Sequence, residues 1–599
     1  MSSRRRITLA LLAGLFFPAL LIAAARAPLT ARRGMVASSH ALASAAGVEI
    51  MRKGGNAVDA AVAVTLAVGV VDPQSAGIGG GGFALWYRAA DHTVRALDFR
   101  ERAPLGATAH MYQDSRGNVV PDVSTDGYLA VAVPGTVAGL EELHRAGGKL
   151  PWREVVAPAI KLAEEGFLVG RRLNQALQDR LEVLKRYPES ASIFLKRGVP
   201  YDVGDLLIQR DLADTLRTVQ EEGAAGFYSG DIARAIASDM EEQGGLITLE
   251  DLAAYKPVWR RPLSGVYRGH TVVSFPPPSS GGVHLLQMLQ LLSAVDVRTL
   301  GRGSTAHLHV VAEAMRRAYA DRATWLGDPA FVDVPVDGLL SPGYLAVRWS
   351  SFSPQLARPL PELQAGDPWP FTSGGRRPAG PVPAASFTNS PNTAHLSIVD
   401  GERNAVALTF TINTGMGSGA VVRGTGILLN NEMDDFSAAP GQPNAYGLVG
   451  GEANAIAPTK IPLSSMTPTL LFTGTPTTVD GVEQPALAVP EPGQLRLVVG
   501  APGGSTIITT VLQVIMNMVD FGDDVAAAVA HPRVHHQWLP DALRYEEDSL
   551  PPDVRRGLFA RGHTLKGGGL WGNATAVAVE GAELQGASDP RGDGVPAGY

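Results

Sequence analysis

The spacing of hydrophobic and polar residues over positions 34–349 alternates between a helical period and short apolar runs. An apolar run predicts a strand at 83–88, and Thr248 with Asp251 has the pattern of a capping box that opens a helix. The helical period predicts helices over 56–71, 152–165, 173–185, 211–222 and 305–325. This alternation of helices and strands indicates an α/β (α+β) protein.

The pattern changes over residues 350–392, where Pro, Gly and Ser are frequent and no apolar period remains. Such a composition predicts an exposed, mobile linker. Immediately after it, alternating residues predict three adjacent antiparallel strands at 394–399, 405–411 and 426–429. A further strand at 495–499, a Gly-rich turn at 500–504 and a helix at 505–518 follow. A linker that leads directly into a strand is an unusual domain boundary, unless the chain is cut there.

The N-terminus has the pattern of an export signal. Three arginines at 4–6 precede an apolar run over 7–21 and the small residues 23–25, which predicts a signal peptide removed near Ala25. The alternative is an uncleaved membrane anchor, because the run is near the lower length limit for a span, although Pro18 interrupts it. No later run is apolar for about 20 residues. We therefore expect the remaining chain to be soluble and either periplasmic or secreted.

Composition narrows the chemistry. The 599 residues include no Cys, which excludes disulfides, thiolate metal sites and a cysteine nucleophile. Covalent catalysis would therefore fall to a hydroxyl, an amine or a carboxylate. A net charge of −7 argues against a nucleic-acid partner. The length alone would favour several domains.

Three familiar patterns carry little weight here. Gly77 to Gly82 matches G-x-G-x-x-G, but a helix-like run precedes it and a strand-like run follows, which is the reverse of a dinucleotide site and favours a turn or close packing. His531, His535 and His536 have a spacing that could bind a metal, but Pro532 disturbs it and structural roles are favoured. The chain has no G-x-S-x-G nucleophile elbow. We expect neither a metal nor a cofactor.

A series of longer motifs resembles the γ-glutamyltranspeptidase family of N-terminal-nucleophile hydrolases. On the C-terminal side these are residues 392–397 (Asn-Thr-Ala-His-Leu-Ser), 409–414, 428–436, 462–468, 502–505, 535–540 and 587–591. On the N-terminal side they are residues 54–61, 98–101, 133–139 and 276–282. The motifs occur in the family's order over nearly the whole mature chain, which makes a chance match untenable.

The resemblance implies a four-layer αββα sandwich built jointly by two subunits, which replaces the expectation of several domains. It also implies a precursor that cuts itself between Asn392 and Thr393, giving a large subunit (26–392) and a small catalytic subunit (393–599) that form a heterodimer. The new N-terminal Thr393 would supply both the nucleophile and, through its α-amine, the base, because an amine with a pKa near ~7.7 is substantially neutral at physiological pH.

The resemblance also assigns roles in a γ-glutamyl site. Thr411 would orient the new N-terminus, and the N–H groups of Gly503 and Gly504 would form an oxyanion hole. The other residues would hold the substrate's α-carboxylate (Arg100, Ser464, Ser465), hold its α-amine (Asn413, Glu432, Asp435), or form a lid over residues 435–460 (Tyr446). The implied donors are glutathione and other γ-glutamyl compounds, and the implied acceptors are water, amino acids and dipeptides.

One departure from the family is Ala394, which replaces a hydroxyl residue common after the nucleophile and is expected to slow maturation without preventing it. Two alternatives remain. The chain could be a glutaryl or cephalosporin (β-lactam) acylase of the same fold, or an uncleaved homologue that has lost activity and kept a binding or structural role.

Overall fold

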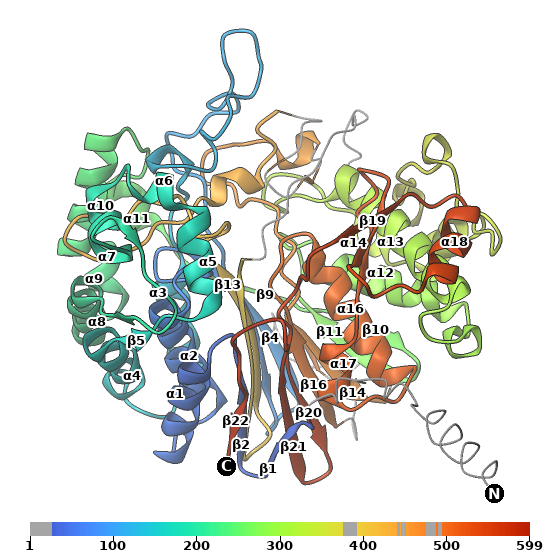
Figure 1. Cartoon of the computed structure of the whole chain (residues 1–599), viewed down its shortest axis with the longest axis horizontal. Coiled ribbons are helices and arrows are strands. Elements are labelled where there is room, and N and C mark those ends of the chain that lie inside the picture. Colours follow the sequence, from blue (N-terminus) through green and yellow to red (C-terminus); the bar gives the residue numbers. More distant parts are fainter. Residues whose placement is uncertain are drawn as a thin grey trace, which may run out of the picture.

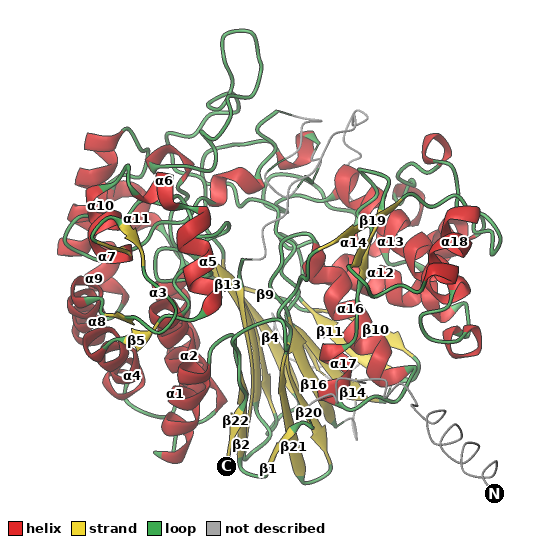
Figure 2. Ribbon diagram, in the orientation of Figure 1, coloured by secondary structure: helices red, strands yellow, loops and turns green. Residues whose placement is uncertain are grey.

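The computed structural model of the whole chain describes residues 27–374, 392–439, 444, 447–448, 451–474, 487–488 and 494–599. Two antiparallel sheets lie face to face at its centre (Figures 1 and 2). The first has the order β1 (Leu29–Ala31), β21 (Glu583–Ser588), β20 (Thr575–Glu580), β16 (Leu495–Gly500), β14 (Thr469–Thr473), β11 (His270–Ser274), β10 (Leu263–Tyr267). The second has the order β15 (Leu487–Ala488), β4 (Thr93–Phe99), β3 (Gly81–Arg88), β13 (Ala405–Thr411), β12 (Ala394–Asp400), β2 (Gly34–Ala37), β22 (Ala597–Gly598), and β9 (Val258–Arg260) pairs with β4.

One helical layer covers the outer face of each sheet, so that the protein is a four-layer αββα sandwich (Figure 2). On the second sheet lie α1 (Ala41–Arg52), α2 (Ala57–Val71), α3 (Thr136–Gly147) and neighbouring helices. On the first lie α12 (Gly281–Ser293), α16 (Thr506–Val519) and α17 (Val525–Ala530). Between the sheets, Phe83 and Phe275 pack with their ring centroids 4.3 Å apart.

Segments from before and after residue 392 share one core. In the second sheet β13 lies beside β3, and β12 lies beside β2. In the first sheet β11 pairs with β14. Because each sheet takes strands from both parts of the chain, a cut after residue 392 would leave two interlocked pieces around a single core.

Most of the predicted elements are present. The helix predicted at 56–71 is α2, where Asn56 caps the N–H groups of Val58 and Asp59 and the Asp59 carboxylate accepts from the Asn56 N–H. The other predictions confirmed are α4 (Trp152–Glu165), α8 (Arg210–Glu222), α11 (Leu249–Ala254) with its capping box, α13 (Thr305–Trp325), α16, β3, β12, β13 and β16. The strands β12 and β13 pair antiparallel, as expected.

Three predictions were wrong. The helix expected over 173–185 is two helices, α5 (Arg171–Asp179) and α6 (Leu181–Leu184), separated at Arg180. Residues 426–429 form no strand and make only an isolated bridge between Val421 and Leu428, because positive φ angles at Gly424 and Gly426 turn the backbone there.

The third error concerns the linker. Its first part, up to residue 374, packs on the protein. Leu363 is buried, and its carbonyl accepts from the Trp538 indole N–H at 2.8 Å. The Trp325 indole likewise donates to the Gly366 carbonyl at 2.9 Å. Residues 375–391 lie outside the described residues, as do residues 1–26 with the expected signal peptide. Among the helices that the structure describes, every one is too short or too polar to span a bilayer.

Candidate active site

Thr393 directly precedes β12 and lines a small cavity. Its backbone φ is +131°, a value that a β-branched residue rarely adopts. The side chain is buried, and its Oγ1 lies 3.1 Å from Oγ1 of Thr411 on the adjacent strand. Strain of this kind costs on the order of 1–3 kcal/mol and persists only where the surroundings enforce it. The strained residue is therefore the one that follows the expected cleavage point.

The Thr411 hydroxyl connects Thr393 to the loop that follows β13. Its Oγ1 accepts from the Asn413 backbone N–H at 2.8 Å. The Asn413 side chain in turn donates to the Asn431 carbonyl at 2.9 Å. A hydroxyl can accept two hydrogen bonds and donate one, so Thr411 can bind the Asn413 N–H and the Thr393 hydroxyl at the same time.

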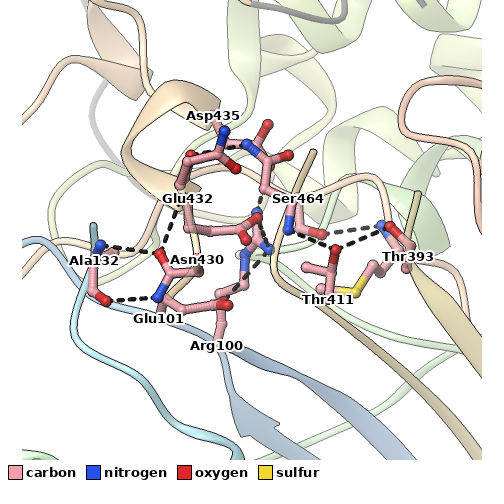
Figure 3. Close-up of polar contacts among 12 residues, drawn as sticks. Arg100, Glu101, Ala132, Thr393, Thr411, Asn430, Glu432, Asp435 and Ser464 are labelled. Carbon is pink, nitrogen blue, oxygen red and sulfur yellow. Dashed lines mark hydrogen bonds and ion pairs between the residues drawn. The ribbon is translucent and has the colours of Figure 1, made fainter. Parts of the chain in front are cut away.

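Arg100, directly after β4, is held by two acids from the segment after β13 (Figure 3). Its two terminal nitrogens form ion pairs with Glu432 and Asp435, and Glu101 lies 3.6 Å from one of them. The sequence had assigned Arg100 to a substrate carboxylate and the two acids to an amine. In the structure these opposite charges neutralise one another, because buried charges need partners.

Burial dominates the electrostatics of this cluster. Desolvation raises the pKa of Glu432 well above its usual range, raises that of Asp435, and raises that of Glu101 to about 7, although Arg100 opposes all three shifts. Burial also works against the Arg100 cation, but the carboxylates of Glu432, Glu101 and Asp435 raise its pKa above the ordinary value. Both Glu101 carboxylate oxygens lack a hydrogen-bond donor within the described chain. The cluster thus places three carboxyl groups around the single guanidinium of Arg100, and burial favours the protonated form of each acid.

Asn430 fixes the acidic segment in place (Figure 3). Its Oδ1 accepts from the N–H groups of Ala132 and Glu432 at 3.0 and 2.9 Å. Its Nδ2 donates to the carbonyls of Gly79 and Ala132, both at 2.8 Å. The buried Asn430 amide therefore ties the backbone of Glu432 to the segments that contain Ala132 and Gly79.

Gly503 and Gly504 follow β16 and have φ angles of +127° and +53°. A Cβ on Gly503 would come within 2.4 Å of Thr506 Oγ1, so only glycine fits without a shift. Neither N–H group donates to a backbone carbonyl within the described chain. Two free, fixed donors are what an oxyanion hole requires.

The cavity is small and brings most of the predicted site residues together. Its lining includes Arg100, Thr393, Thr411, Asn413, Glu432, Asp435, Ser464, Ser465 and Gly504. Gly503 precedes Gly504, and Asn392 precedes Thr393, whereas Tyr446 lies outside the described residues. From the expected lid segment, Leu448 lines the cavity.

The patterns given little weight also have positions in the structure. A Cβ on Gly80 would come within 1.9 Å of the Thr411 carbonyl, and one on Gly82 within 2.3 Å of the Thr409 carbonyl, which confirms a close-packing role for this glycine run. His535 contacts Thr509 Oγ1 at 2.9 Å, and His536 pairs with Asp541 at 3.2 Å. In the described part of the chain, no three His, Cys, Asp or Glu side chains are placed to hold a metal.

Sequence reasoning missed three residues of the site's surroundings. Glu101 and Asn430 lie inside motifs that were recognised, but roles were given only to their neighbours in those motifs. Arg322 lies in α13 and donates to Ser465 Oγ at 3.1 Å. A charged residue on a helix face that is otherwise buried was the available signal.

Comparison with known proteins agrees with this geometry. Residues 43–599 match the family described as Gamma-glutamyltranspeptidase. The chain belongs to the γ-glutamyltranspeptidase family. A glutathione hydrolase proenzyme of Escherichia coli (strain K12) is 45% identical over 579 residues, which cover 96% of this chain and 93% of that protein.

Some similar proteins are named acylases and not glutathione hydrolases. An Acylase ACY 1 proenzyme of Pseudomonas sp. (strain SE83) is 36% identical and covers 95% of this chain and 94% of its own. The crystal structure of a cephalosporin acylase from Bacillus halodurans has a TM-score of 0.81 at 28% identity, covering 96% and 97%. A chain of Helicobacter pylori gamma-glutamyltranspeptidase has a TM-score of 0.54 at 46% identity, covering 55% of this chain and 94% of its own.

Proposed function

We propose that the chain is a γ-glutamyltranspeptidase precursor that cuts itself between Asn392 and Thr393. The observation that carries the proposal is the placement of Thr393, strained at φ +131°, beside the Thr411 hydroxyl in a cavity lined by charges of both signs. The products are a large subunit of residues 26–392 and a small subunit of residues 393–599. They stay together because each sheet contains strands from both subunits.

The self-cleavage needs only the Thr393 hydroxyl, the peptide bond between Asn392 and Thr393, and a water molecule. The Thr393 hydroxyl adds to the Asn392 carbonyl, the C–N bond breaks, and the acyl group moves from nitrogen to oxygen. Water then hydrolyses the ester, which frees the Asn392 carboxylate and the Thr393 α-amine. Releasing the backbone strain at Thr393 favours this direction.

The mature enzyme transfers a γ-glutamyl group through the same hydroxyl. The α-amine takes the hydroxyl proton, Oγ1 attacks the γ-carbonyl, and the amine of the donor leaves with that proton. Water or an amine then takes the glutamyl group from this ester. We propose glutathione and other γ-glutamyl amides as donors, and amino acids or dipeptides as acceptors alongside water.

The charged lining matches a zwitterionic glutamyl group. The substrate carboxylate takes Arg100 with hydrogen bonds from Ser464 and Ser465, and its ammonium takes Glu432 and Asp435, with the Asn413 amide. When the substrate binds, each charged side chain that gives up a partner within the Arg100 cluster gains a substrate group of opposite sign. No charge is then left buried without a partner. The N–H groups of Gly503 and Gly504 stabilise the oxyanion.

A glutaryl or cephalosporin acylase is the second candidate, and the names of two relatives favour it. Glu432 and Asp435 argue against it, because a glutaryl group has no ammonium to accompany them in the cavity. We further propose export, with a signal peptide removed near Ala25, because of the N-terminal arginine and apolar pattern. The protein is then periplasmic or secreted.

Replacing Thr393 by Ala tests the function. We expect the variant to stay a single band on a denaturing gel and to release no p-nitroaniline from γ-glutamyl-p-nitroanilide, whereas the parent gives two bands and turns over. Thr393→Ser keeps the hydroxyl and is the matched control, with processing retained. Two subunits from Thr393→Ala would refute the mechanism, and a single band from the active parent would refute self-cleavage.

A further inference from the structure

Arg322 is a buried cation beside the site that the proposed mechanism does not use. It lies in α13, is 4% exposed, and makes no direct ion pair within the described residues, although the Asp435 charge acts on it from a greater distance. The desolvation of an unpaired guanidinium is costly. Charged side chains are seldom fully buried without a partner, so the presence of Arg here needs a reason beyond packing.

The hydrogen bonds of Arg322 reach two serines on separate segments. Its Nε donates to Ser280 Oγ at 2.9 Å, and one terminal nitrogen donates to Ser465 Oγ at 3.1 Å. Ser280 directly precedes α12, which lies in the same helical layer as α13 (Figure 1). Ser465 lines the cavity that holds Thr393.

The two hydroxyls differ in where their protons go. The Ser280 hydroxyl donates onward to the Ser464 carbonyl at 2.7 Å, so its single proton is used within the protein. The Ser280 N–H also donates to that carbonyl, at 2.8 Å, which clamps the 464–465 segment in place. The Ser465 hydroxyl accepts from Arg322, but it donates to no acceptor in the described chain.

A hydroxyl that accepts from a guanidinium has its proton turned away from that guanidinium. Ser465 lines the cavity that holds Thr393, and no acceptor in the described chain takes this proton, so it is available to a ligand there. We infer that Arg322 is a positioning residue that fixes Ser465 as a hydrogen-bond donor to the substrate's α-carboxylate and adds its own positive charge behind that bond. The inference rests on the proposed γ-glutamyl function and adds to it.

This role explains why the site has two arginines. Arg100 is ion-paired with Glu432 and Asp435, so a substrate carboxylate that approaches it must compete with both. Ser465, polarised by Arg322, offers a donor that no acid of the described chain occupies. Arg322 therefore contributes to choosing glutamyl amides over amides that lack the α-carboxylate.

The experiment compares L-γ-glutamyl-p-nitroanilide with 4-aminobutyryl-p-nitroanilide, which keeps the ammonium and lacks the α-carboxylate. For Arg322→Gln we expect KM for the glutamyl substrate to rise by about 10–100-fold with kcat within about threefold. The kcat/KM for the aminobutyryl substrate should stay within about threefold. Arg322→Lys keeps a charge at a single donor and should recover part of the glutamyl KM.

A double-mutant cycle separates positioning from scaffolding. In a Ser465→Ala background, Arg322→Gln should cost the glutamyl substrate no more than about threefold further, because the group through which it acts is gone. If Arg322 had only a structural role, Arg322→Gln would lower kcat/KM for both substrates equally. Its effect would also add in full to that of Ser465→Ala. Either result would overturn the inference.

Two-band processing on a gel is the folding check for each variant. If Arg322→Gln is not processed, Ser280→Ala decides the matter, because it removes the Nε acceptor and leaves the charge. A rise in KM for the glutamyl substrate alone supports the inference, and equal changes for both substrates refute it. A parent with no glutamyl turnover would instead refute the proposed function itself.

Discussion

Replacing Asp435 by Asn removes one negative charge from the site while changing the side-chain volume very little. In the structure the Asp435 carboxylate is paired with Arg100, and its side chain is 12% exposed. Arg100 keeps Glu432 as a partner in the variant, so its cation stays compensated. The substitution therefore acts mainly on the ammonium of a bound glutamyl group.

The expected magnitude follows from one lost charge-assisted hydrogen bond, which is worth about 1.5–3 kcal/mol. At about 1.4 kcal/mol per factor of ten, kcat/KM for γ-glutamyl-p-nitroanilide should fall roughly 10–150-fold. A glutaryl anilide has no ammonium and loses nothing, so its kcat/KM should stay level or rise. The parent should prefer the glutamyl substrate by roughly 10²–10⁴, since a site built for a polar group rejects its absence.

The assay is kcat/KM for both anilides with the parent, Asp435→Asn and a neighbouring control. Asp434→Asn is the control, because Asp434 is buried one residue away, accepts from Ser124 Oγ at 2.8 Å and does not line the cavity. It should change both substrates by the same factor. Equal parent activity on both anilides, or an unchanged preference in Asp435→Asn, would refute the reasoning and place the acylase function first.

Three further outcomes are expected. Arg100→Lys keeps the charge and loses the planar fork, so processing should continue while glutamyl kcat/KM falls at least tenfold, by the ~1.5–3 kcal/mol of a charged hydrogen bond; unchanged kinetics would remove Arg100 from the site. Gly503→Ala places a Cβ only 2.4 Å from Thr506 Oγ1 and should lower kcat about 10²–10³-fold. The control Gly522→Ala, at φ +72° with no neighbour within 4 Å, should leave kcat unchanged. Equal effects of the two substitutions would exclude the oxyanion role. Burial raises the pKa of Glu101 from 4.5 to about 7, so the folded state holds its proton longer as pH rises. Stability is therefore lost between those values, and Glu101→Gln should gain on the parent by up to about 3 kcal/mol from pH 5 to pH 8 in denaturant titrations; a constant difference would contradict the shift.

Local patterns were sufficient for elements whose side chains follow one period. The helices at 152–165 and 305–325 were predicted with the bounds that the structure has, because a continuous apolar stripe or buried face identifies a helix without its partners. Residues 426–429 were mistaken for a strand, since an apolar run does not reveal that Gly424 and Gly426 turn the chain at its start. The packed segment before residue 374 was missed because its contacts, such as Leu363 with Trp538, join residues far apart in sequence.

The sequence by itself determined the chemical inventory: no thiol, a Thr after a Pro- and Gly-rich segment, and motifs that name Arg100, Glu432, Asp435 and the glycine pair. Only the tertiary structure decided how these groups neutralise one another. The ion pairs of Arg100 join residues more than 300 positions apart, and the contact of Arg322 with Ser465 joins two that are 143 apart. The reason is physical: periodicity reports which face of an element is buried, whereas the charge balance of a site depends on which buried faces meet.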